Sequence, residues 1–221
     1  MEDVNYLNDD MLTVSSSKEL FDISFYSDRT SLRDIENFVR FVKSCEWAVR
    51  KSDEYRSFKA QLVEKGLTRC QILGHIDSDG EDGVDVEMHH GPLFTLFDYC
   101  AIVIDALLAR GEKVSSFRVA RLVLDEHFED HVQVVMLSKT VHQLVDTGNM
   151  FIHFNQATGN INGFIEKYRD GITPDRVEKI NKYIEMCEQF DTFDNGLLEL
   201  KNTMTDWNYD VAKERMQKSN G

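Results

Sequence analysis

The amino-acid sequence predicts an α+β fold that is mostly helical. Over most of the chain, apolar residues recur three or four positions apart, which is the spacing of an amphipathic helix. A few short segments alternate instead, most clearly VDVEMHH at 84–90 and VQVVML at 132–137. With 221 residues, of which 42% are apolar, the chain is long enough to bury a core. We therefore expect a small sheet set among helices.

The N-terminal part is expected to begin as an arm and to continue as two helices. Residues 1–30 are polar and weakly patterned, with one short strand predicted near FDISFY at 21–26. A helix should begin near Ser31, since Ile35 and Val42 belong to an apolar row at helical spacing. The second helix is predicted over 52–64.

The middle of the chain is predicted to contain a β-hairpin followed by two helices. TRCQILGHI at 68–76 and VDVEMHH at 84–90 are strand-like, and the acidic DSDGEDG at 77–83 would form the tip. This tip lacks the spacing of carboxylates, glycine and glutamate that an EF-hand needs, so we assign it no metal. The two helices are expected over 93–109 and 115–128.

The remaining elements complete three predicted regions. A helix should follow VQVVML and run to Asp146, MFIHF should form another strand, and a helix should begin at Thr173 with Pro174 in its first turn. The tail after Asn195 is amphipathic and then polar. The regions are an N-terminal helical part (1–68), a sheet-containing core (69–170) with a helical insertion (93–130), and a C-terminal helical part (171–221).

Composition narrows the classes of partner and compartment. The net charge of −14 disfavours nucleic acid except at local basic segments, and 43–69 carries seven Lys/Arg against four Asp/Glu. The four cysteines form no CxxC pair, which argues against a disulfide scaffold and a cysteine-ligated zinc site. We find no signal-peptide pattern and no uninterrupted membrane-spanning run. A cytoplasmic protein without a membrane partner is expected.

Four residues form a candidate metal and acid–base constellation. His89 and His90 end a predicted strand, where neighbouring side chains point to opposite faces, so each can serve a separate role. His142 and Asp146 lie four residues apart on a predicted helix and hence on one face. Imidazole and carboxylate together suit a divalent transition metal, and a histidine that binds no metal can act as a general base near neutral pH.

These segments resemble those of the HNH (ββα-metal, or His-Me finger) endonuclease family, most closely its HHH variant in colicin-type DNases. VEMHHGPL is similar to the first strand of that family, and LSKTVHQLVDTG is similar to its helical segment LCxxCHxxxH. The similarity covers Val84–Pro92 and Val132–Met150 and implies a ββα-metal core. Ser138 and Val141 stand where that pattern has cysteines, so the accessory zinc knuckle should be absent.

The resemblance also implies roles for individual residues. The implied activity is metal-dependent hydrolysis of DNA phosphodiester bonds, with one Mg, Mn, Ni or Zn ion and a histidine that activates water. His90 would be the general base, and Gln133, in place of the family's asparagine, would orient it. The implied metal ligands are His89, His142 and Asp146, and the candidate phosphate contacts are Arg118 and Arg121.

Two other function classes stay open at this point. A non-catalytic structural or interaction protein of a phage or another mobile element would retain a degenerate form of the same scaffold, and the acidic charge and Gln133 favour it. Its partner would be a protein bound through the N-terminal or C-terminal helices. A helical regulatory protein with a purely structural metal is the third alternative. A phage-encoded protein of any of these classes would act in the host cytoplasm.

Overall fold

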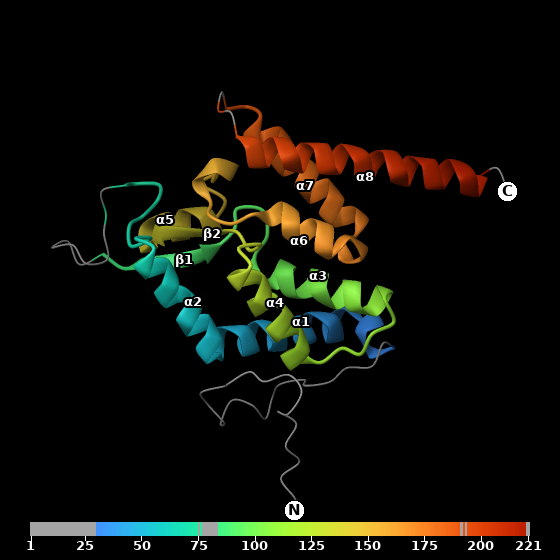
Figure 1. Cartoon of the computed structure of the whole chain (residues 1–221), viewed down its shortest axis with the longest axis horizontal. Helices are drawn as coiled ribbons and strands as arrows, with labels where there is room; N and C mark the ends of the chain where they lie inside the picture. The colour runs from blue at the N-terminus through green and yellow to red at the C-terminus, as the bar shows by residue number, and fades with distance from the viewer. Residues whose placement is uncertain (1–29, 75, 77–83, 191, 193, 220–221) are drawn as a thin grey trace, which may run out of the picture.

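The computed structural model describes residues 30–74, 76, 84–190, 192 and 194–219 and confirms a mostly helical α+β fold (Figure 1). In this part of the chain, helices surround a two-stranded antiparallel sheet. The strand predicted at 21–26 and the acidic tip predicted at 77–83 lie outside the described residues.

The first two predicted helices are confirmed. After a 3-10 turn, η2 (Ser31–Arg33), helix α1 spans Ile35–Lys51 and helix α2 spans Asp53–Glu64. The residue before each helix caps it. The carboxylate of Asp34 accepts a hydrogen bond from the backbone N–H of Asn37, and the Ser52 hydroxyl accepts one from the N–H of Tyr55.

Helices α3 (Leu96–Ala109) and α4 (Ser116–Phe128) form the predicted insertion and pack against α1. Thr95 and Asp98 make a reciprocal capping box at the start of α3. Most side chains of α3 are buried, including those of Tyr99 and Ile102, so this helix lies at the centre of the protein. The insertion therefore carries much of the core.

The sheet pairs β1 (Val86–His90) with β2 (Val134–Ser138), and helix α5 (Lys139–Asp146) follows β2 directly and contacts both strands. The predicted hairpin between 68–76 and 84–90 is therefore wrong. Gln71 instead lies beside the outer edge of β2, where its N–H donates to the carbonyl of Met136 and its side-chain oxygen accepts from the N–H of Met136. The chain then turns at 71–74, where the Gly74 N–H donates to the Cys70 carbonyl and Gly74 has a φ of 67°.

The C-terminal part departs from prediction at one segment. MFIHF forms no strand: it is irregular and runs into the 3-10 turn η3 (Phe154–Gln156), with the Ile152 carbonyl accepting a hydrogen bond from the Tyr183 hydroxyl. Two further elements, α6 (Ile161–Lys167) and η4 (Arg169–Gly171), were not predicted. The expected helices are confirmed as α7 (Pro174–Cys187) and α8 (Asn195–Ser219), the latter extending past the other elements in Figure 1.

One large hydrophobic cluster joins helices from all three predicted regions, with Phe41, Tyr99 and Trp207 among its members. A smaller cluster lies beneath α5 on one face of the sheet and includes Val135 and Leu137. It fixes α5 over that face. Among the described helices, none combines the length and the apolar character that crossing a membrane requires.

Candidate functional site: a histidine and carboxylate cluster on the sheet

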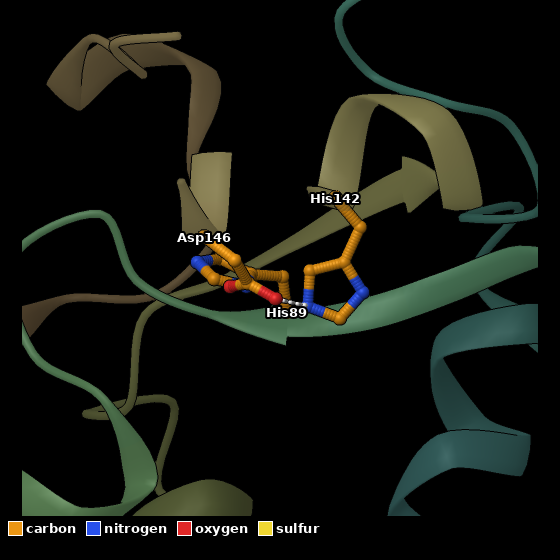
Figure 2. Close-up of side chains that lie close together, drawn as sticks. All are labelled: His89, His142 and Asp146. Carbon is orange, nitrogen blue, oxygen red and sulfur yellow. Dashed lines mark ion pairs between the residues drawn. The ribbon is translucent and has the colours of Figure 1, made fainter. Parts of the chain in front are cut away.

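The cluster is formed where α5 crosses the β1 strand. Strand alternation directs His89 toward α5 and His90 toward α2 and α4, so the expected division of the two histidines between opposite faces is confirmed. Figure 2 shows His89, from β1, beside His142 and Asp146, from α5. The structure thus brings together all three residues that the sequence suggested as metal ligands.

The three side chains offer one ligand atom each within a small volume. Asp146 lies 3.9 Å from His89, measured between Oδ1 and Nδ1, and 3.6 Å from His142, measured between Oδ2 and Nε2. All three ligand atoms lie within 4.8 Å of one another. Nitrogen and oxygen ligands bind Zn²⁺ at about 2.0–2.2 Å, so small side-chain rotations would close this set around one ion.

Glu87 selects the tautomer that His142 needs as a ligand. The Glu87 carboxylate lies 2.7 Å from Nδ1 of His142 and can only accept, so Nδ1 carries a proton, and in the neutral ring the lone pair is on Nε2. A carboxylate behind a ligating histidine is the usual outer partner in metal sites. Sequence reasoning missed Glu87, although strand alternation places it on the same face as His89, two residues away.

His89 is held in its neutral form by its surroundings. Burial lowers its pKa, the neighbouring His142 lowers it further, and the Asp146 carboxylate opposes both effects. A neutral imidazole is the form that binds a metal. Gly91 makes room for this ring: a Cβ there would lie 2.9 Å from Nε2 of His89.

The chemistry of the donor set favours a transition metal. Imidazole ligands suit zinc, nickel, copper and iron, whereas magnesium prefers an all-oxygen shell. Asp146 ends α5, and the negative end of a helix dipole also favours a cation nearby. Two imidazoles and one carboxylate leave coordination positions open, as in catalytic zinc sites. The residues therefore fit one divalent ion of the zinc or nickel type.

His90, the expected general base, does not join this cluster. It is 5% exposed, and its Nε2 lies 3.0 Å from Nε2 of His127. Nδ1 of His127 donates to the Val123 carbonyl, so its Nε2 accepts and His90 must donate its own proton. Tyr55 stacks on the His90 ring, and Phe58 meets the His127 ring edge-on. This placement corrects the expectation that His90 faces the same substrate as the metal, because alternation turns it into the core.

Burial lowers the pKa of both histidines in this pair. For His127 the pKa falls from 6.5 to about 4, although the hydrogen bond to the Val123 carbonyl opposes the shift. For His90 the pKa falls well below its usual value, and the nearby His127 adds to the effect of burial. The pair is thus neutral at physiological pH. Sequence reasoning gave His127 no role, since a lone histidine on an amphipathic helix carries no signal of its partner.

The remaining expected residues do not assemble around His90 or the cluster. Gln133 is fully buried, and neither side-chain atom has a hydrogen-bond partner among the described residues, so it does not orient His90. Its backbone N–H donates to the Tyr99 hydroxyl. Arg118 binds the Glu112 carboxylate and the Lys113 carbonyl, and Arg121 is exposed elsewhere on α4. The phosphate-binding role expected of these arginines has no geometric support.

A second group, Glu126, Glu129 and His131, could also be considered for a metal. Glu126 is fully buried, and its carboxylate accepts from Tyr168 and lies 2.8 Å from Nδ1 of His131. The Lys167 ammonium lies 2.6 Å from Glu126 and 2.9 Å from Glu129. That ammonium already supplies the cation for both carboxylates. This group is an ion-pair network that joins α4 to α6.

Comparison with known proteins adds one match. Residues 2–217 match the family of bacteriophage G278-like virion proteins. Comparison with curated proteins and with solved structures gave no match. Because the family match covers almost all of the 221 residues, the chain belongs to the bacteriophage G278-like virion protein family.

Proposed function

We propose that this chain is a non-catalytic structural or interaction protein of the phage particle, with a divalent metal that fastens α5 to β1. Membership in a virion protein family supports the particle role. The metal would be held by His89 on the strand and by His142 and Asp146 on the helix. Such a link would stabilise an eight-residue helix, which is too short to be stable by itself.

One observation supports the proposal that the protein is not catalytic. A hydrolytic nuclease needs a general base within hydrogen-bond reach of the attacking water. His90 is buried on the opposite face of the sheet from His89, and its Nε2 proton is already donated to His127. The cluster therefore has metal ligands without the base that the HNH resemblance implies. The net charge of −14 further disfavours DNA as a partner.

A metal-dependent endonuclease of the HNH type acting on DNA is the second candidate. It is favoured by the assembly of His89, His142 and Asp146, which matches the ligand set implied by the resemblance. Three protein ligands would leave positions at which water and a phosphate oxygen could bind. In this candidate, a residue other than His90 would have to supply the base.

Two assays separate these candidates. Mass spectrometry of purified phage particles should detect the chain at a fixed copy number, and plasmid DNA should stay intact with Mg²⁺, Mn²⁺, Ni²⁺ or Zn²⁺. The cleavage assay would include His89→Ala and, as a matched control, His153→Ala, which alters a buried histidine outside the cluster. Metal-dependent nicking that His89→Ala abolishes and His153→Ala retains would establish the nuclease instead. Absence of the chain from intact particles would contradict the structural role.

A further inference from the structure

The outer edge of β1 carries backbone groups that no strand pairs with among the described residues. The Lys139 N–H donates to the Asp85 carbonyl, and the Gly91 N–H donates to the Gln133 carbonyl. These bonds fix the pattern of the ladder, in which every second residue of β1 points its N–H and C=O toward β2. The groups of Val86 and Met88 therefore point away from β2, toward α2.

A groove of about 590 Å³ lies along this edge. Its sheet side includes Val86 and Met88, and its helix side includes Lys59 and Arg50. Glu87 and His142, from the cluster described above, also line it. The helix side also carries apolar surface, including Val63 of α2, which is 52% exposed. No described residue donates to or accepts from the outward backbone groups of Val86 and Met88. An edge of this kind is a template for an added strand.

We propose that residues 21–25 of a second copy of this chain add to β1 as a third strand. Phe21, Ile23 and Phe25 alternate with Asp22 and Ser24, which is the pattern of a strand with one apolar face. The apolar row suits the exposed apolar surface of the groove, and main-chain hydrogen bonds would supply the pairing.

Charge complementarity supports this occupant. Residues 1–29 contain seven Asp/Glu and two Lys/Arg, whereas 43–69, which covers most of α1 and α2, contains four Asp/Glu and seven Lys/Arg. The groove presents two of those cations, Arg50 and Lys59, and one carboxylate, that of Glu87. Each copy therefore has an acidic arm and a groove with more cations than carboxylates, which are the two halves of an interface between copies.

The length of the connection indicates a second copy as the donor. Thr30 precedes α1, whereas Arg50 lies near its C-terminal end, so α1 separates them (Figure 1). A helix of 17 residues is about 25 Å long. Phe25 is five residues before Thr30, and five extended residues span at most about 18 Å. Five residues are therefore shorter than α1, which favours the arm of a second copy as the donor.

Isotope-mixed cross-linking tests the proposal with the full chain. Chains labelled with ¹⁴N and ¹⁵N are refolded together and treated with a carbodiimide, which joins amines to nearby carboxylates. Lys59 should couple to Asp22, or to its acidic neighbours Glu19 and Asp28, and about half of these products should pair a light with a heavy peptide. The link between Lys182 and Glu178, 2.7 Å apart within one chain, is the internal control.

Two cross-linking outcomes would overturn the proposal. The first is a set of arm products that always combines peptides of the same isotope. The second is the absence of arm products in a sample where the Lys182–Glu178 control has formed. Protection of Lys59 from acylation gives a further check. If duplex DNA protects Lys59 and a second copy of the chain does not, the groove would bind phosphate and the proposal would be rejected.

Light scattering gives an independent readout of the same contact. The wild-type mass should exceed the 25.6 kDa of one chain, and Met88→Pro, which removes the outward N–H, should return it to that value. Met88→Ala keeps the N–H and should keep the larger mass. If Met88→Pro does not fold, Asp22→Lys and Lys59→Glu should each weaken association at least tenfold, and together they should restore it. A single-chain mass at every concentration, or association unchanged in these variants, would reject the proposal.

Discussion

The two faces of the sheet place adjacent histidines in opposite chemical settings. On one face, His89 meets Asp146 and His142 in a partly exposed cluster. On the other face, His90 and His127 share one hydrogen bond beneath Tyr55 and are closed off from solvent. Two adjacent residues can thus occupy a candidate metal site and a packed core, because the strand directs each side chain to its own face.

Replacing each of the two histidines by alanine should give the largest difference in stability between the two faces. With EDTA present, His90→Ala should lower the free energy of unfolding by about 3 kcal/mol, because it leaves a cavity and an unpaired acceptor on His127. His89→Ala should lower it by about 1 kcal/mol, since this ring lies in an open site. Urea unfolding measures both values. Equal losses would contradict the assignment of one face to packing and the other to binding.

Acid should destabilise the protein through the buried pair. The folded-state pKa of His127 is about 4 and its ordinary value is 6.5, so between these pH values the unfolded chain binds more protons than the folded chain. Stability is therefore fully present above pH 6.5 and falls as the pH approaches 4, by on the order of 3 kcal/mol. The shift of His90 has the same sign.

Urea midpoints collected across this pH range with EDTA would measure the effect. His127→Gln should flatten the profile, and His153→Gln, which leaves the pair intact, should not. A midpoint that stays constant between pH 7 and 4 in the wild type would show that the pair is not neutral in the folded protein.

Removing the Glu87 charge behind His142 should have the smallest effect of these changes, and that effect should be on metal affinity. Glu87→Gln should weaken zinc binding by about tenfold, because a neutral amide oxygen can still accept from Nδ1 but no longer raises the basicity of Nε2. Competition with a chromophoric chelator measures this change. Glu112→Gln, in the connection between α3 and α4 and outside the cluster, is the control. An unchanged affinity in Glu87→Gln would remove Glu87 from the site.

The sequence predicted the parts of the site that depend on local periodicity. Alternation in β1 and the four-residue spacing of His142 and Asp146 on α5 correctly indicated that these ligands share a face with His89. The partner of His90 could not be predicted in this way. His127 lies 37 residues away on a helix, and only the packing of α4 on the sheet brings it to 3.0 Å.

Elements whose partners are non-local were also the ones that sequence reasoning misassigned. The segment at 68–76 has strand-like composition, but β1 pairs with β2 instead, and Gln71 of this segment bonds Met136 at the other edge of β2. MFIHF has the composition of a strand, but Ile152 and Phe154 are buried as irregular chain. Composition alone did not distinguish a strand from a buried irregular segment.

Zinc titration of the full chain followed by calorimetry tests the central contrast between the two faces most directly. Wild type and His90→Gln should each bind one ion per chain, and His89→Ala should bind roughly 100-fold more weakly or not at all. That result would assign the ion to the α5 face of the sheet. Equally tight binding by His89→Ala, or a loss confined to His90→Gln, would contradict the account.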